Sequence, residues 1–206
     1  MLLSLDGQFA YLAMTKTGST SVENALRPHC QVMFTGDHRV THMPGHHFER
    51  YVRPYLLETG QPPIDSVAQI RHPVDWLESW WRYRGRDAGP QSTRGIGFDQ
   101  FADEFMAGAD RPYLGLHRPH AFFYGEGTDI QVDLVFRFEE MALFQRFLEM
   151  RLGRPVTIER HNVSPTRWLK GSRAVRRRLE TFLTPEMELW EGATRSSLQG
   201  LDPRPA

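Results

Sequence analysis

The segment that most constrains the fold is residues 10–22, AYLAMTKTGSTSV. Residues 9–14 are uniformly apolar and predict a short buried strand. Small and hydroxylated residues around Lys16 then predict a tight loop, and residues 19–27 predict a helix with one apolar face. A strand that passes through a short loop into a helix is typical of α/β proteins.

The rest of the chain repeats this alternation. Strands are predicted at 64–70 and 132–138, and helical segments at 46–58, from Pro73 to about 84, at 98–107, 139–152 and 173–183, and from Thr184 onward. Two loops rich in glycine and polar residues, 85–97 and 110–128, lie between them. We therefore expect one domain over residues 1–206, with an α/β fold around a central, mainly parallel sheet.

Composition excludes several classes of protein. Lys+Arg and Asp+Glu both total 25, so the chain lacks the basic excess of a general nucleic-acid binder, and any anion site must be a local concentration of charge. Cys30 is the only cysteine, which excludes an intrachain disulfide. No apolar run approaches the ~18 residues of a membrane span, and Asp6 and Gln8 interrupt the first apolar stretch, which also lacks a basic leader. We expect no transmembrane segment, no signal peptide and a cytoplasmic location.

The loop after the first strand has the chemistry of an anion site. Gly18 permits a tight turn, and Ser19, Thr20 and Ser21 lie at the expected helix start, where backbone N–H groups lack an intrahelical acceptor. Lys16 adds a positive charge, but it precedes the glycine, unlike the lysine of the triphosphate-binding loop. These residues predict a phosphate or sulfate site; the alternative is a capped helix with exposed polar residues.

A second anion motif follows the second strand, in residues 67–84, VAQIRHPVDWLESWWRYR. Arg71 is expected at the strand end, where its planar guanidinium suits phosphate oxygens. Ser79 lies about two turns into the helix that Pro73 begins, and its hydroxyl could reach the same phosphate. The alternative is a surface ion pair between Arg71 and Asp75.

The pair of motifs, TKTGSTS and then IRHPVDWLESWW, resembles the sulfotransferases that use 3′-phosphoadenosine-5′-phosphosulfate (PAPS), and is closer to their carbohydrate branch. The resemblance implies a three-layer, P-loop NTPase-like fold and no metal. It implies that Lys16, Thr17, Gly18, Ser19, Thr20 and Ser21 hold the 5′-phosphosulfate. It also implies that Arg71 and Ser79 hold the 3′-phosphate.

Weaker similarities extend toward the C-terminus. LVFRFEEM resembles the late strand and acidic turn of that family, HNVSPT (161–166) a segment of the carbohydrate branch, and LKGSR (169–173) a segment that contacts the 3′-phosphate. The branch implies a hydroxyl acceptor on a carbohydrate or glycoconjugate, with loops 85–97 and 110–128 shaping its cleft. Four arginines between 173 and 178 either help to hold the nucleotide or form a solvated helix face.

The mechanism that this family implies places Lys16 on the leaving oxygen and needs a base for the acceptor proton. The resemblance favours His42 as the base, because a histidine after Lys or Thr recurs in this region of the carbohydrate branch, and His46 is the next candidate; His47 and Glu49 remain open. The histidines also suggest zinc, but no Cys, Asp or Glu completes a ligand set, so we expect no metal.

Trp80 and Trp81 are neighbours on one predicted helix. They cannot both point inward, so one of them is expected to line a pocket.

Two other functions remain as alternatives. A P-loop-like small-metabolite kinase would require Mg²⁺, and a non-catalytic protein of the same fold would bind the nucleotide without turnover. We expect the sulfotransferase, because the two motifs occur together and in order.

Overall fold

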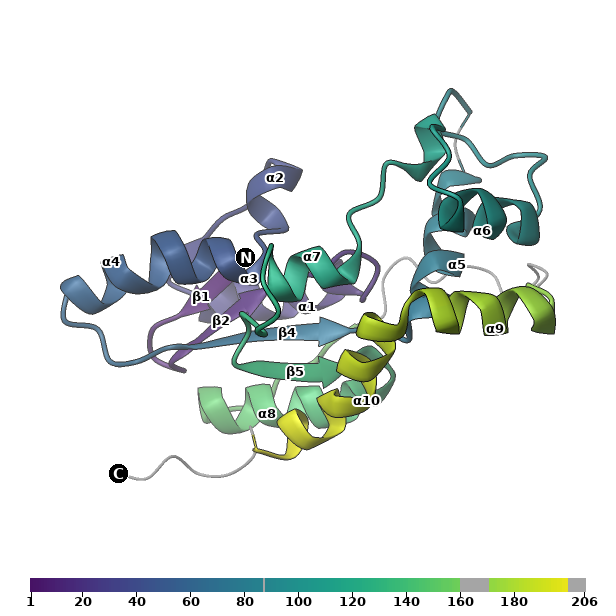
Figure 1. Ribbon diagram of the computed structural model, residues 1–206. Helices are drawn as coiled ribbons and strands as arrows, with labels where there is room; N and C mark the ends of the chain where they lie inside the picture. Colours follow the sequence, from purple (N-terminus) through teal and green to yellow (C-terminus); the bar gives the residue numbers. More distant parts are fainter. Residues whose placement is uncertain (87, 160–170, 200–206) are drawn as a thin grey trace.

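The computed structural model of this 206-residue chain describes residues 1–86, 88–159 and 171–199, with side chains up to residue 193. It is an α/β fold on an open, five-stranded mixed sheet of order β3-β1-β2-β4-β5 (Figure 1). The strands are β1 (Leu2–Ser4), β2 (Phe9–Leu12), β3 (Val32–Met33), β4 (Asp65–Ile70) and β5 (Leu134–Arg137).

The sheet is not mainly parallel, so that expectation was wrong. β2 pairs in parallel with β4, and β4 with β5, but β1 is antiparallel to both β2 and β3. Residues 5–8 join β1 to β2, and so short a connection makes an antiparallel hairpin. Asp6 and Gln8, which interrupt the apolar run in the sequence, lie in this turn. The apolar run therefore forms two strands, β1 before the turn and β2 after it.

Most helices lie where the apolar spacing predicts them. Helices at 19–27, 73–84, 98–107, 139–152, 173–183 and from Thr184 are confirmed to within two residues, and the segment 46–58 is helical throughout as α3, η2 and α4. The short α2 and α7 were not predicted. The helical elements are α1 (Ser19–Leu26), η1 (Arg27–His29), α2 (His38–Thr41), α3 (Gly45–His47), the π-helix η2 (Phe48–Val52), α4 (Arg53–Glu58), α5 (Pro73–Arg84), α6 (Phe98–Met106), η3 (Pro112–Leu114), α7 (Pro119–Tyr124), η4 (Phe138–Glu140), α8 (Met141–Leu152), α9 (Arg173–Phe182) and α10 (Thr184–Gln199).

Helices cover both faces of the sheet, because successive strand residues point to opposite sides. Along β2, Phe9 and Tyr11 face a core that includes Val22 of α1 and Phe144 of α8. Ala10 and Leu12, which alternate with Phe9 and Tyr11, face the other core, which is built from residues of η2, α4, α5, α6, α7, α9 and α10.

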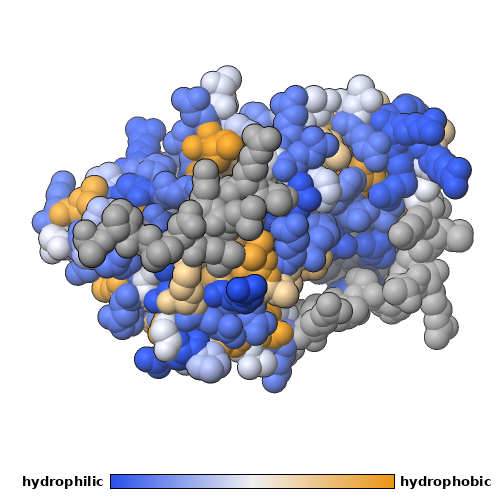
Figure 2. All heavy atoms as spheres, turned by 90° about the horizontal axis from the view of Figure 1, so that it is seen from below, coloured by the Kyte–Doolittle hydropathy of each residue, from blue (hydrophilic) through white to orange (hydrophobic). Residues whose placement is uncertain are grey.

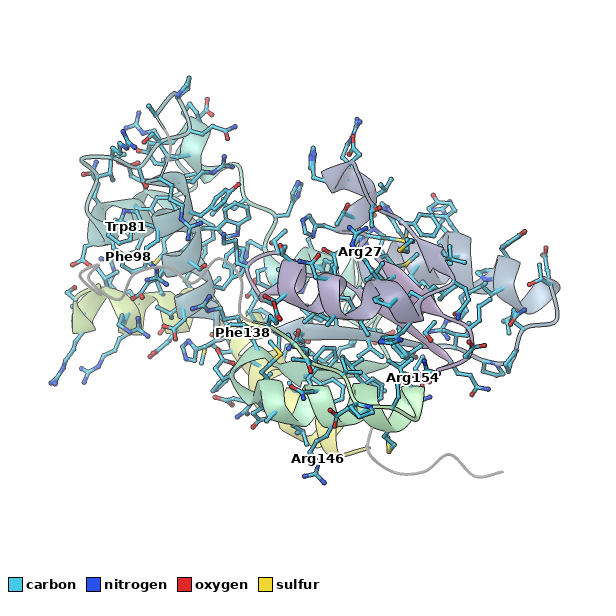
Figure 3. All side chains as sticks on the ribbon, turned by 180° about the vertical axis from the view of Figure 1, so that it is seen from behind. Arg27, Trp81, Phe98, Phe138, Arg146 and Arg154 are labelled. Carbon is cyan, nitrogen blue, oxygen red and sulfur yellow. The ribbon has the colours of Figure 1, made fainter. Side chains whose placement is uncertain are left out.

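A second group of helices, α5, α6 and α9, lies beyond the carboxyl end of β4 (Figure 1). Trp81 and Phe98 pack edge to face inside it, with ring centroids 5.7 Å apart (Figure 3). The Trp81 indole N–H also donates to the carbonyl of Ile96 at 2.8 Å. α10 then returns along β5, where Arg137 donates to the carbonyl of Trp190 at 2.8 Å. Because α5 begins shortly after β4 ends, it lies next to the carboxyl end of this strand.

The face seen in Figure 2 shows many hydrophilic residues, and hydrophobic residues are also exposed on it. Among the helices in the described parts of the chain, none has the length and apolar character needed to cross a bilayer.

Candidate functional site

The parallel pairing of β2 and β4 brings the two predicted anion motifs to one edge of the sheet. The loop after β2 carries Lys16, and Arg71 follows the last residue of β4. A guanidinium Nη of Arg71 donates to the backbone carbonyl of Lys16 at 3.4 Å, across 55 residues of sequence. The structure therefore brings Lys16 and Arg71 side by side.

The loop between β2 and α1 is held in a tight, unusual shape. Lys16 has φ 65° and Gly18 φ 71°; this left-handed conformation suits glycine but costs a residue with a side chain about 1–2 kcal/mol. Thr17 is fully buried, and its hydroxyl donates to the carbonyl of Met14 at 2.8 Å. The Thr17 side chain therefore closes the loop.

Packing below the loop requires glycine at position 18. A Cβ there would lie 3.1 Å from the ring of Phe138, which sits where the sheet meets the α5 region (Figure 3). Gly18 is also the residue that precedes α1, and no side chain caps this helix. The first N–H groups of an uncapped helix lack acceptors and favour an anion.

The three hydroxyl residues at the start of α1 differ in exposure. Ser19 and Ser21 are each 7% exposed, and Thr20 is exposed. The Ser21 N–H already donates to the carbonyl of Gly18 at 2.9 Å, in the first turn. The N–H groups before Ser21 and the Thr20 hydroxyl are thus the groups best placed for a ligand.

Lys16 is surrounded by positive charge. Its ammonium lies 3.8 Å from the ring centroid of Tyr83 and 5.2 Å from that of Trp80, both on α5. Burial, and then repulsion by Arg86, Arg71, Arg82 and Arg84, lowers the pKa of Lys16 to about 8. Within the described residues, neither Lys16 nor Arg71 has a carboxylate at ion-pair distance. An anionic ligand would relieve this repulsion.

Three hydrogen-bond donors near Lys16 also lack acceptors. The buried Nε of Arg71, Nε1 of Trp80 and Nε of Arg84 have no partner within the described parts of the chain. Burial is also the main cause that lowers the pKa of Arg71. Because buried donors are normally satisfied, unpaired N–H groups beside an excess of positive charge indicate a site for an acceptor-rich anion.

Ser79 lies on α5 as the spacing predicts, and it is half-buried. In the described residues it makes no hydrogen bond to Arg71, so the structure does not join these two predicted phosphate ligands directly. The alternative pairing of Arg71 with Asp75 does not form either, because Asp75 accepts from Arg176 at 2.9 Å.

Of the candidate bases, His42 is the one that contacts the loop. Its Nδ1 lies 2.7 Å from the backbone carbonyl oxygen of Ala13. Because a carbonyl oxygen can only accept, Nδ1 carries the proton in this bond. The Nε2 of a neutral His42 therefore has a free lone pair, as a general base requires.

His46, His47 and Glu49 lie elsewhere. The ring of His46 packs against Gly125 and lies 4.2 Å from the ring of His47; burial and the neighbouring His47 lower the pKa of His46. Glu49 accepts from Arg53 at 2.6 Å, and Arg53 also donates to Ile64, at the opposite end of β4 from Arg71. These contacts place Glu49 at the far end of β4 from Arg71, and they place His46 beside Gly125 with His47 next to it.

The weaker C-terminal motifs have structural partners where they are described. Arg176 bonds Asp75 and Glu78 of α5, and Arg178 pairs with Asp103 of α6 at 2.9 Å, so these two arginines hold α9 in place. Residues 161–166, and residues 169 and 170 of the segment 169–173, lie outside the described residues.

Sequence reasoning missed one contribution to the site. In the acidic turn, Glu139 accepts from the His72 backbone N–H at 2.9 Å and from the Trp190 indole at 3.0 Å, which fixes the turn that presents Arg71. The sequence indicates the acidic turn after β5, but it does not indicate that this turn contacts His72, shortly after β4. Trp80 and Trp81 do not both point inward, as their adjacency predicts: Trp80, together with Tyr83, faces Lys16, whereas Trp81 is 8% exposed and lies in the core.

Comparison with known proteins adds no family assignment, because the sequence matches no known family model and no curated protein matches it significantly. Any function must therefore be inferred from the site and from the motif resemblance. Among the described residues, no group of three or more His, Cys, Asp or Glu side chains is arranged to hold a metal ion.

Proposed function

We propose that this protein is a PAPS-dependent sulfotransferase that transfers a sulfuryl group to a hydroxyl acceptor. The observation that carries the proposal is the contact between Arg71 and the Lys16 loop, because it brings two separate anion motifs to one edge of the sheet. A ligand with one anionic group on the loop and another on Arg71 has the layout of PAPS, which carries a 5′-phosphosulfate and a 3′-phosphate.

In this proposal the protein acts by positioning and by electrostatic stabilisation. The N–H groups at the start of α1 hold the 5′-phosphosulfate, and Arg71 holds the 3′-phosphate. An S–O bond forms to the acceptor oxygen as the S–O bond to the 5′-phosphate breaks. The electron pair of the broken bond stays on that phosphate oxygen, where Lys16 neutralises it, and 3′-phosphoadenosine-5′-phosphate (PAP) leaves.

The acceptor hydroxyl must lose its proton as the sulfuryl group arrives. We assign that proton to the Nε2 of His42, since its Nδ1 is committed to the carbonyl of Ala13 and so keeps the ring turned to the loop. The proposal also includes a carbohydrate acceptor, on the basis of the motif resemblance. It includes a cytoplasmic location on the basis of the composition.

A kinase that uses ATP and Mg²⁺ fits the same edge less well. Mg²⁺ sites use carboxylates, and the acids nearest Arg71 are already engaged. Asp75 and Glu78 bind Arg176, and Glu139 bonds the His72 N–H and the Trp190 indole. The surroundings of Lys16 are instead rich in arginine.

The test is a comparison of ligands by thermal shift. At a hundred times its dissociation constant, PAP should raise the melting temperature by about 5–10 °C, since such saturation stabilises a protein by about 2.7 kcal/mol. ATP with Mg²⁺ should give a smaller shift, and transfer of labelled sulfuryl from PAPS to hydroxyl acceptors would establish turnover.

Matched variants sharpen this test. Arg71→Ala should weaken PAP about 10–100-fold, as expected for a lost charge-assisted hydrogen bond, whereas Arg177→Ala on the exposed side of α9 should not. A larger shift with ATP–Mg²⁺ would favour the kinase. PAP binding without any sulfuryl transfer would favour the non-catalytic alternative, and no PAP binding would refute the proposal.

A further inference from the structure

Three cations surround an aromatic pair at the far end of α5. Trp80 and Tyr83 pack edge to face, with ring centroids 5.7 Å apart. Lys16 lies over Tyr83, the guanidinium carbon of Arg84 lies 5.4 Å from the Trp80 ring centroid, and that of Arg86 lies 5.9 Å from the Tyr83 ring centroid. Positive charge therefore continues past Lys16, away from Arg71.

Beside this cluster lies a polar pocket of about 360 Å³. Tyr83 and Arg84 line it together with residues 88–92. The volume falls within the range of small-molecule sites. Arg84 donates one N–H to the Gln91 side chain, but its buried Nε, like the nearby Nε1 of Trp80, has no acceptor in the described parts of the chain. The pocket wall thus offers the charge of Arg84 for one more anion, and the adjacent aromatic pair adds the indole N–H of Trp80.

This anion is distinct from the donor nucleotide. α5 has 12 residues, so its two ends are about 18 Å apart, with Arg71 before its first residue and Arg84 as its last. Lys16 reaches the aromatic pair from the loop, between these ends. A nucleotide that spans Arg71 and Lys16 leaves Arg84 on the side from which an acceptor would approach.

We propose that the acceptor carries an acidic group, a carboxylate or a sulfate, which binds Arg84 and the Trp80 indole N–H while its hydroxyl faces the sulfuryl group held at the Lys16 loop. This inference rests on the proposed sulfotransferase function and names the chemistry of its acceptor. A neutral acceptor would leave Arg84 and Trp80 with unpaired buried donors, which disfavours its binding.

The experiment measures binding of dextran, carboxymethyl-dextran and dextran sulfate of matched length to the full chain saturated with PAP, by calorimetry. We expect the protein to bind at least one charged polymer at least tenfold more tightly than dextran, and to transfer labelled sulfuryl from PAPS to it. Comparison of carboxymethyl-dextran with dextran sulfate shows whether the site prefers a carboxylate or a sulfate.

Arg84→Gln should weaken binding of the preferred charged polymer by about tenfold, so that most of its advantage over dextran is lost. The PAP dissociation constant should change less than threefold. The control is Arg177→Gln, which removes the same charge from an exposed position on α9 and should bind all three polymers like the wild type. Equal binding of charged and neutral polymers, an equal loss in the control, or an unchanged preference in Arg84→Gln would overturn the inference.

Two further results separate this inference from the function itself. If Arg84→Gln weakens PAP as strongly as Arg71→Ala, then Arg84 belongs to the nucleotide site and the acceptor inference is wrong. If the wild type does not bind PAP at all, the proposed function fails first, and the acceptor inference fails with it.

Discussion

The guanidinium of Arg71 lies against the backbone carbonyl of Lys16, 3.4 Å away, although 55 residues separate the two in sequence. The contact joins the end of β4 to the loop after β2. Lys16, which supplies the carbonyl, has a strained, left-handed backbone conformation. Strain of this kind persists when the surrounding structure holds it in place and often marks functional sites. The predictions below test this edge of the sheet and its support.

Nucleotide affinity should depend on the charge of Lys16. Burial and the neighbouring arginines lower the pKa of Lys16 to about 8, so its ammonium is charged below this pH and neutral above it. Bound phosphate would raise that pKa, so PAP affinity should be constant below pH 8 and fall by up to about tenfold per pH unit above it. Calorimetry from pH 7 to 9.5 measures this.

Lys16→Arg is the matched variant for this titration, since arginine stays charged throughout the range. It should retain PAP affinity at pH 9, where the wild type has lost part of its own. A parallel decline in both proteins would show that another group titrates.

His42 should affect turnover and not nucleotide binding. His42→Asn keeps an amide N–H that can donate to the carbonyl of Ala13 but supplies no base. We expect sulfuryl transfer to fall by about 100–10,000-fold with the PAP dissociation constant unchanged. His46→Asn, against the Gly125 turn, is the control and should stay near the wild-type rate. Normal turnover in His42→Asn would remove histidine 42 from the mechanism.

Gly18 and Gly60 form a matched pair for the loop. Both have left-handed backbones, with φ 71° and 77°, so Gly→Ala should destabilise the protein by about 1–2 kcal/mol at either position, or roughly 2–8 °C in melting temperature. Only at position 18 would the new Cβ meet Phe138, at 3.1 Å, and Arg71 stacks 5.0 Å from that ring centroid. PAP affinity should therefore fall in Gly18→Ala alone. Equal affinity in both variants would argue against this coupling.

The start of α10 should depend on one ion pair with α7. Glu186 is fully buried, and Arg118 donates to both of its carboxylate oxygens at 2.9 Å. Arg118→Ala leaves that carboxylate without its guanidinium, so we expect a loss of about 3 kcal/mol in the free energy of unfolding, measured with denaturant. Adding Glu186→Gln should recover part of the loss, because it removes the unpaired buried charge. A double variant no more stable than Arg118→Ala would contradict this.

Local sequence patterns determined much of this protein. Apolar runs located β2, β4 and β5 to within two residues, and Pro73 marked the first residue of α5. The loop around Lys16 and the arginine after β4 were recognisable because glycine, hydroxyl and cationic residues at strand ends have few structural uses together. Such features depend on neighbours in sequence, which periodicity and residue type record directly.

Tertiary structure alone decided the rest. The two-residue β3 is too short for a pattern, and the hairpin of β1 with β2 turned an expected parallel sheet into a mixed one. Likewise, the sequence favours His42 as the base but leaves Glu49 open, and only the structure separates them: His42 contacts the loop at Ala13, and Glu49 pairs with Arg53 at the far end of β4. Strand order and side-chain partners depend on which distant segments pack together, and local sequence does not encode that packing.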